Sequence, residues 1–216
     1  MVDRDTLEQA ARNIDPVALT GRLWRQVAPP FALDRVPPEG RGGRYDREDG
    51  PPVLYLSDRR RGAWAELFRP HTGTTEVSLH LVRRRIGTVS VAQLELLDVA
   101  DPQVRAQLGI VDDDLVADGY TLCQDLADAA RDAGFDGLRA PAGAMAGPRT
   151  VVVFAHAATK VVADGPGSVT TPPWRSAVDL VDIRFRHART FRSAVAGLSL
   201  RWRVRTALSL LFRRRR

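Results

Sequence analysis

The hydrophobic positions of the chain fall into short continuous or alternating runs, which are typical of strands, and a few runs with helical spacing. Strands are predicted where apolar and β-branched residues concentrate between turn residues. They cover Val17–Val27, Val53–Ser57, Glu76–Val82, Ser90–Val99, Val151–Phe154 and Lys160–Val162. Apolar residues with helical spacing predict helices over residues 5–13, in the segment after Asp58, and over 101–108 and 120–133. Strands outnumber helices and do not alternate regularly with them, so the pattern predicts an α+β fold.

Several helix ends carry local signals. Asp58 precedes a helix whose inward stripe is predicted to be Trp64, Leu67 and Phe68. Asp101-Pro102 opens the next helix, with proline at the favoured first position. Gly134 is predicted to end the helix that begins at Tyr120.

Proline and glycine divide the chain into segments. Residues 28–52 are rich in both, which predicts a long ordered loop or a mobile lid. A second such stretch, GPGSVTTPP, follows Asp164 and is typical of a linker. The predicted organisation is a helical lead-in at 1–20, one domain at 21–164, a linker at 165–174 and an arginine-rich tail at 175–216.

Composition indicates a globular chain of ordinary size. It has 216 residues, 44% hydrophobic and 27% charged, enough to bury a real core. The single cysteine, Cys123, excludes a disulfide framework and a cysteine-based zinc site, and we expect it to be a small buried side chain. The four histidines have no ligand spacing, so no metal is expected. With a polar start and no apolar run of about 20 residues, we expect a soluble cytoplasmic protein.

The net charge of +6 hides a strong asymmetry. Residues 174–216 carry net +10 and residues 1–173 carry net −4. In the tail, arginines are interleaved with Phe, Trp, Val and Leu, which predicts an amphipathic helix. Such a helix suits an anionic membrane surface, a nucleic acid or an acidic partner protein, and a solvated extension without a role stays an alternative.

Candidate chemistry lies between residues 24 and 66. Arg25 is on an early strand, Gly43 and Arg44 are in the proline- and glycine-rich segment, Tyr55 follows eleven residues later, and Glu66 a further eleven. Each residue alone is more often structural than functional. Together they suit an anionic ligand that carries a flat ring and a reacting sugar, because guanidinium groups bind pyrophosphate in a bidentate manner and glycine allows close backbone approach.

The order and spacing of these motifs resemble the RES domain family. The resemblance rests on LWR, GGRY, PPVLYLSDRRRGAWAELF and QDLADAARDAGFDGLRAP leading to VVVF, and it covers about residues 21–162. It implies a mixed sheet with flanking helices, a fold like that of ADP-ribosyltransferases, and a bacterial toxin encoded with a small antitoxin. It also implies cleavage of NAD⁺ at the nicotinamide–ribose bond, by phosphate, to ADP-ribose-1''-phosphate and nicotinamide.

The resemblance implies a role for each candidate residue. Arg25 would engage the phosphates or ribose of NAD⁺, with Gly43 and Arg44 as a second phosphate-side contact. Tyr55 would pack against nicotinamide or its ribose, and Glu66 would be the catalytic carboxylate. A fixed carboxylate stabilises the oxocarbenium charge that develops as the bond breaks. NAD⁺ and inorganic phosphate are expected as substrates, with no permanently bound cofactor. A small Xre-type helix-turn-helix antitoxin and a homo-oligomer are the partners expected.

One position departs from the family pattern. The family serine follows the proline of the Arg139-Ala140-Pro141 segment, and Ala142 stands there in this chain. The serine is therefore dispensable, or activity is attenuated, or the chain is a catalytically impaired module whose tail binds membrane, nucleic acid or a partner protein. Transfer of ADP-ribose to a protein target is a further alternative.

Overall fold

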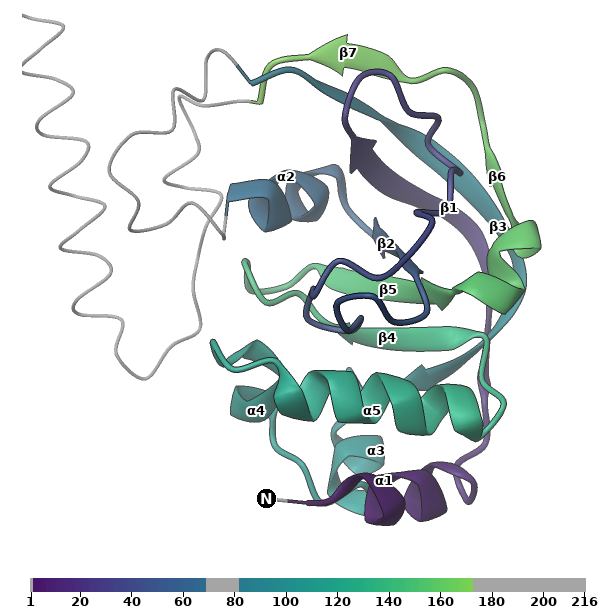
Figure 1. Ribbon diagram of the computed structural model, residues 1–216, viewed down its shortest axis with the longest axis vertical. Helices are drawn as coiled ribbons and strands as arrows, with labels where there is room; N and C mark the ends of the chain where they lie inside the picture. The colour runs from purple at the N-terminus through teal and green to yellow at the C-terminus, as the bar shows by residue number, and fades with distance from the viewer. Residues whose placement is uncertain (1, 69–81, 173–216) are drawn as a thin grey trace, which may run out of the picture.

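The computed structural model describes residues 2–68 and 82–172 (Figure 1). The predicted strand at Glu76–Val82, apart from Val82, lies outside the described residues. So does the predicted basic tail at 175–216.

A mixed sheet forms the centre of the molecule. Its strands are β1 (Val17–Val27), β2 (Val53–Ser57), β3 (Arg84–Asp98), β4 (Gly137–Pro141), β5 (Arg149–Phe154), β6 (Val161–Ala163) and β7 (Ser168–Thr170). The order is β1-β2-β5-β4-β3-β6, with β7 also paired to β3. Strands β3 and β4 run parallel, and the other paired strands run antiparallel.

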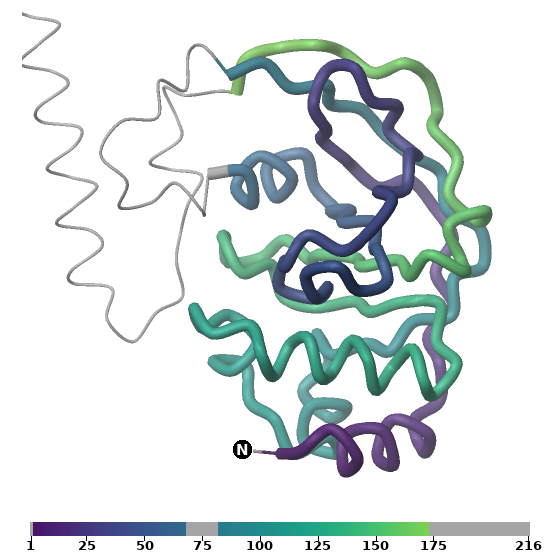
Figure 2. Tube along the Cα trace, viewed as in Figure 1, coloured from purple at the N-terminus to yellow at the C-terminus, as the bar shows by residue number. Residues whose placement is uncertain are grey.

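The sheet curls back on itself. Strand β1 pairs with β3 from Val17 opposite Leu96 to Val27 opposite Arg85. It meets β2 at one register position, Trp24 opposite Ser57. Strands β1 and β2 therefore touch at one point, and the segment between them, residues 28–52, crosses in front of β2 and β5 in the view of Figure 2.

The helices flank this sheet. They are α1 (Arg4–Ala11), α2 (Arg60–Phe68), α3 (Pro102–Gln107), α4 (Asp112–Val116) and α5 (Thr121–Asp132), with a 3-10 turn at Ala155–Lys160. Helices α1, α3 and α5 lie together beside β4, and α2 lies apart from them, beyond β5 (Figure 1). This arrangement confirms the predicted α+β class, a mixed sheet with flanking helices. No helix in the described ranges is both long and apolar enough to cross a membrane.

Side-chain alternation along the strands separates two apolar clusters. Leu54 and Leu56 of β2 join Val151 and Val153 of β5 in one cluster. The residues between them in sequence point to the other face, where the second cluster packs against α1 and α5. A third, smaller cluster joins Trp64 of α2 to the segment after β4.

Helix α5 follows its sequence signals closely. It buries Cys123, Leu126 and Ala130, and Cys123 is buried as predicted. Gly134 adopts a φ of +92°. The amides of Gly134 and Phe135 then donate to the carbonyls of Arg131 and Ala130, which is the Schellman pattern of helix termination.

Other predictions agree less fully. Asp101-Pro102 opens α3 as predicted, and the Asp101 carboxylate caps it by accepting from the amide of Gln103 at 2.7 Å. Asp58, predicted to cap α2, accepts from the amide of Arg149. Strand β4 was not predicted, and its Gly137 lies so close to β5 that a Cβ there would meet the Val152 carbonyl oxygen at 1.9 Å. Strand β1 begins inside the predicted lead-in, and β7 lies inside the predicted linker.

Candidate functional site

The turn at Gly42–Asp46 contacts β2 at Tyr55, whose hydroxyl binds the Tyr45 amide and the Asp46 carboxylate. Gly42 has a φ of +66°, a conformation that favours glycine. A Cβ on Gly43 would lie 2.4 Å from Asp46 Oδ1 and 2.7 Å from Tyr55 Oη. Glycine is therefore needed at position 43, because the Asp46 carboxylate and the Tyr55 hydroxyl occupy the space that a side chain there would take.

Tyr55 lies on β2 with its hydroxyl held on both sides. The hydroxyl donates to Asp46 Oδ1 and accepts from the amide of Tyr45 at 2.8 Å. Burial of the hydroxyl, reinforced by the Asp46 charge, raises the pKa of Tyr55 well above its usual value. The residue as a whole is still 37% exposed. Its hydroxyl end is thus enclosed while part of its surface stays accessible.

Arg44 points into the protein interior and is 8% exposed. Its Nη1 donates to the carbonyls of Leu115 at 3.0 Å and Ala117 at 2.9 Å. The guanidinium also lies 4.7 Å from the ring centre of Tyr120. Its Nη2 is buried and has no hydrogen-bond partner among the described residues. Nη1 is thus hydrogen-bonded to the backbone, whereas Nη2 has N–H donors that no described residue accepts.

Tyr45, the residue after Arg44, is buried at 2% exposure, with its hydroxyl near Cys123. Burial, together with the nearby Cys123, raises the pKa of Tyr45 well above its usual value. Arg44 acts in the opposite direction, and the charge of Glu66 adds to the rise. Tyr45 therefore lies within electrostatic reach of both Arg44 and Glu66.

Glu66 lies on α2 and is half-buried. Its Oε1 accepts from the amide of Ala144 at 3.2 Å. Ala144 belongs to the segment after β4, which also holds Ala142, the position where the family pattern has serine. The structure thus brings Glu66 and the 142–144 segment together across 78 residues of sequence.

Ala142 is buried, and its amide donates to the Pro148 carbonyl at 3.1 Å. It lines a cleft of about 230 Å³ together with Arg105, Met145 and Arg149 among others. The wall of this cleft carries a methyl group where a hydroxyl was expected.

Arg25 is buried separately from the Arg44 turn. It lies on β1 at 7% exposure, and its Nη1 donates to the Leu33 carbonyl. Burial lowers the pKa of Arg25 to about 10, with Asp34 acting against the shift and Arg41 adding to it. Arg25 stays charged at neutral pH, in surroundings that disfavour the charge.

The 28–52 segment connects these two arginine sites. The amide of Arg41 donates to Asp46 Oδ2, and the charge of Arg41 acts on Arg25. Gly43, Asp46 and Tyr55 thus form one contacting set, and Arg44 leaves the same turn toward Leu115, Ala117 and Tyr120. Glu66 and Ala142 adjoin it through Tyr45 and Ala144, and Arg25 stands beside it without a recorded direct contact.

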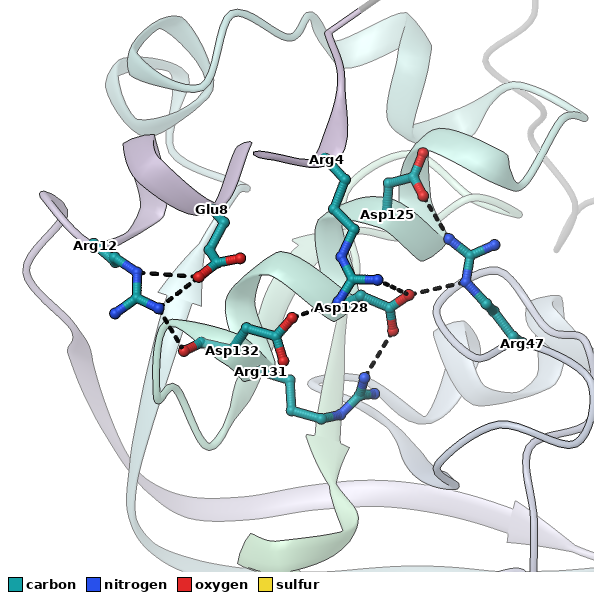
Figure 3. Close-up of polar contacts among 8 residues, drawn as sticks. All are labelled: Arg4, Glu8, Arg12, Arg47, Asp125, Asp128, Arg131 and Asp132. Atoms are coloured by element: carbon teal, nitrogen blue, oxygen red, sulfur yellow. Dashed lines mark hydrogen bonds and ion pairs between the residues drawn. The ribbon is translucent and has the colours of Figure 1, made fainter. Parts of the chain in front are cut away.

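Sequence reasoning missed the residues that hold the turn in place. Gln124 Nε2 donates to the carbonyls of Gly43 at 3.0 Å and Asp46 at 3.2 Å. Arg47 binds Asp125 and Asp128 of α5. Figure 3 shows this ion-pair network, which continues to Arg4, Arg131 and Asp132. The charged pair Asp46-Arg47 at the end of the glycine turn could have indicated a polar network. The partners of Arg47 lie 78 and 81 residues away in sequence and could not be identified from it.

Across residues 2–68 and 82–172, no three His, Cys, Asp or Glu side chains lie close enough to hold a metal ion.

Comparison with known proteins gives consistent matches. The family model of the RES domain matches residues 20–179. A relative from Mycobacterium tuberculosis named as a probable NAD(+) phosphorylase is 42% identical over 160 residues, which are 74% of this chain and 76% of the relative. The NAD(+) phosphorylase MbcT of M. tuberculosis and M. bovis is 31% identical over 117 residues, which are 53% of this chain and 61% of that protein.

A solved structure shares the fold. The crystal structure of the M. tuberculosis MbcT–MbcA toxin–antitoxin complex matches with a TM-score of 0.65 and 23% identity. The match covers 82% of this chain and 97% of that chain.

Proposed function

The chain belongs to the RES domain family, as the sequence motifs indicated, and from this premise we propose that it cleaves NAD⁺ by phosphorolysis as a toxin-type enzyme. The bond between nicotinamide nitrogen and ribose C1'' breaks, and nicotinamide leaves with the electron pair as a neutral ring. A phosphate oxygen then bonds to C1'', giving ADP-ribose-1''-phosphate. The names of the relatives support phosphate as acceptor over water or protein.

The observation that carries this proposal is the placement of Glu66. Its carboxylate is held by the Ala144 amide at 3.2 Å and acts on the Tyr45 hydroxyl of the glycine turn. A carboxylate held in position by a backbone amide can stabilise oxocarbenium charge on ribose without reorganising. Electrostatic stabilisation by such preorganised groups is usually the largest contribution to catalysis. Because nicotinamide leaves as a neutral ring, the reaction needs no strong general acid.

Two buried arginines supply the complementary charge for the pyrophosphate. Neither Arg25 nor Arg44 has a carboxylate hydrogen-bond partner among the described residues, and both donate to backbone carbonyls. Arg44 keeps Nη2 without a partner. An anion that reaches these groups replaces the solvation they lost on burial, so we infer that the NAD⁺ phosphates bind there.

Tyr55 and Ala142 complete the proposed site. Tyr55 offers an accessible surface for nicotinamide or its ribose, and Gly43 lets the turn close on Tyr55. The methyl group of Ala142 lacks the hydrogen bond that a serine hydroxyl would give at this point. We propose that activity is retained but attenuated, because the chain retains Glu66 and both arginines.

The finer expectations from the family stand on analogy. These are a fold like that of ADP-ribosyltransferases and a cytoplasmic location. We also propose a small antitoxin partner, on the precedent of the MbcT–MbcA complex. Its Xre type, self-association of the chain and contacts of the 175–216 tail are further proposals.

The function is tested by NAD⁺ consumption on purified protein, with and without inorganic phosphate. We expect loss of NAD⁺ that requires phosphate and disappears in Glu66→Gln. Loss without phosphate indicates a glycohydrolase, and transfer of label from NAD⁺ to protein indicates an ADP-ribosyltransferase. No loss at high protein concentration, with NAD⁺ still bound, identifies an impaired module, which is the outcome that Ala142 favours.

A further inference from the structure

Asp46 is a buried carboxylate that was not among the predicted site residues. It is 5% exposed. One carboxylate oxygen accepts from the Tyr55 hydroxyl, and the other accepts from the Arg41 amide. Hydrogen bonds to an ionised acceptor are about twice as strong as neutral ones. Asp46 therefore fastens two separate parts of the glycine turn to each other and to β2.

The same contacts use up the hydroxyl of Tyr55. Its proton is donated to Asp46, and its oxygen accepts from the Tyr45 amide at 2.8 Å. A hydroxyl has one donor, so none remains for a ligand. Since 37% of the residue is exposed, the part of Tyr55 left for contact is its ring.

Packing around Gly43 makes this arrangement specific. The Asp46 carboxylate and the Tyr55 hydroxyl occupy the space that a Cβ at position 43 would need. Gln124 holds the carbonyls of Gly43 and Asp46 from the side of α5. The turn that carries Arg44 and Tyr45 is thus positioned by a carboxylate, a hydroxyl and an amide that all meet at Asp46.

We propose that Asp46 is a positioning residue of the NAD⁺ site: it holds the Tyr55 hydroxyl so that Tyr55 presents its ring to the ligand, and it fixes the turn that carries Arg44. This inference rests on the proposed function for the identity of the ligand. It assigns the Tyr55 hydroxyl to the protein and the Tyr55 ring to NAD⁺.

The test compares substitutions at the two ends of the Asp46–Tyr55 hydrogen bond. Asp46→Ala removes both acceptors, and we expect KM for NAD⁺ to rise about tenfold or more with a smaller change in kcat. Asp46→Asn keeps one carbonyl oxygen for the Tyr55 hydroxyl and should fall between Asp46→Ala and wild type. Tyr55→Phe keeps the ring and should resemble Asp46→Asn, whereas Tyr55→Leu should raise KM well beyond either.

A double substitution separates positioning from direct contact. If Asp46 acts through Tyr55, Asp46→Ala raises KM by a smaller factor in the Tyr55→Phe background than in wild type. If the two KM increases simply multiply, the proposal is overturned because Asp46 then acts independently of Tyr55. It is also overturned if Tyr55→Phe is as impaired as Tyr55→Leu, because the hydroxyl then contacts the ligand itself.

The matched control is Asp128→Asn. Asp128 ties the same segment to α5 through Arg47, with Arg47 Nε 2.9 Å from its carboxylate, but it does not contact Tyr55. We expect KM within about twofold of wild type. A rise equal to that of Asp46→Asn contradicts the proposal, since any loosening of the segment would then suffice.

A ligand-free measurement keeps the two proposals apart. Urea unfolding of the wild type, Asp46→Ala, Tyr55→Phe and the double variant should give a non-zero coupling free energy between positions 46 and 55. Wild-type protein that neither binds nor consumes NAD⁺ sinks the proposed function, and this coupling then decides the Asp46–Tyr55 arrangement. Additive losses of stability overturn that arrangement.

Discussion

Arg44 and Arg47 leave one turn and end in contrasting surroundings. Arg47 binds the carboxylates of Asp125 and Asp128 at the partly exposed surface of α5 (Figure 3). Arg44 is buried, and its recorded acceptors are the carbonyls of Leu115 and Ala117 and the Cys123 sulfur. The first arginine has counter-charges within the protein, and the second has none within hydrogen-bond reach among the described residues.

The presence or absence of a carboxylate partner within the protein distinguishes structural arginines from candidate ligand-binding arginines. In the Arg47 network each cation meets a carboxylate, so the network is electrically complete without a ligand. Arg131, whose Nε lacks an acceptor, still binds Asp128 and lies 4.6 Å from the Phe154 ring centre. Arg44 and Arg25 donate to backbone carbonyls instead, and we propose that an external anion neutralises their buried charge.

The largest effect on activity is expected when the acidic group of the proposed site, Glu66, is neutralised. Glu66→Gln keeps the shape and the Ala144 contact but removes the charge that we propose stabilises the oxocarbenium ion. We expect kcat to fall about 10²–10³-fold with little change in NAD⁺ affinity. Steady-state kinetics and calorimetric binding measure the two separately. Glu8→Gln, in the α1 part of the network, is the matched control, and equal losses of kcat and affinity in Glu66→Gln would remove Glu66 from this role.

The second substitution replaces Arg25, a buried cation without a carboxylate hydrogen-bond partner among the described residues. Arg25→Met should weaken NAD⁺ binding about 10- to 100-fold, because a charged donor to the phosphates is lost. Thermal stability should stay near that of wild type or rise, since the buried charge is disfavoured in the free protein. Calorimetry and thermal melts check both. Unchanged affinity combined with a large loss of stability would make Arg25 a structural residue.

A third change restores the hydroxyl of the family pattern. Ala142→Ser is expected to raise kcat several-fold, up to about tenfold, if the hydrogen bond strengthens in the transition state. Ala106→Ser, at an exposed position of α3, is the control. An unchanged kcat in Ala142→Ser would show that this site does not need the hydroxyl.

The smallest effect is expected in the closed network. Asp128→Asn should lower the free energy of unfolding by about 1 kcal/mol, because its ion pairs are partly exposed and therefore partly screened by solvent. Burial alone would raise the pKa of Asp128, but hydrogen bonds from Arg47 and Arg131 outweigh it and lower the pKa. The stabilisation is present above the unfolded pKa and disappears as pH falls through the lowered folded value. Urea unfolding at several pH values checks this, and a difference between the two proteins that persists below both pKa values would contradict it.

The sequence predicts the elements whose signals are local. Strand β1 was predicted with its observed bounds, Val17–Val27, and Gly134 ends α5 as expected. Strand β4 escaped prediction because its five residues include Gly137, Arg139 and Pro141, which give little strand signal. The parallel pairing with β3 that stabilises β4 is set by tertiary contacts.

The candidate site is predictable in its residues more than in its contacts. The motifs place Arg44, Tyr55 and Glu66 in the right order, but the partner of each is fixed by the fold. Gln124 lies 81 residues from Gly43, and Ala144 lies 78 residues from Glu66. No local pattern indicates that the Tyr55 hydroxyl is occupied by Asp46.

The most direct test of the central claim is ³¹P NMR of purified protein incubated with NAD⁺ and inorganic phosphate, beside Glu66→Gln. We predict a new phosphate-ester resonance of ADP-ribose-1''-phosphate that grows as NAD⁺ and free phosphate decline together, and that is strongly reduced in the variant. Unchanged NAD⁺ in the wild type, or a product signal of equal size in Glu66→Gln, would contradict the claim that the Glu66 site performs phosphorolysis.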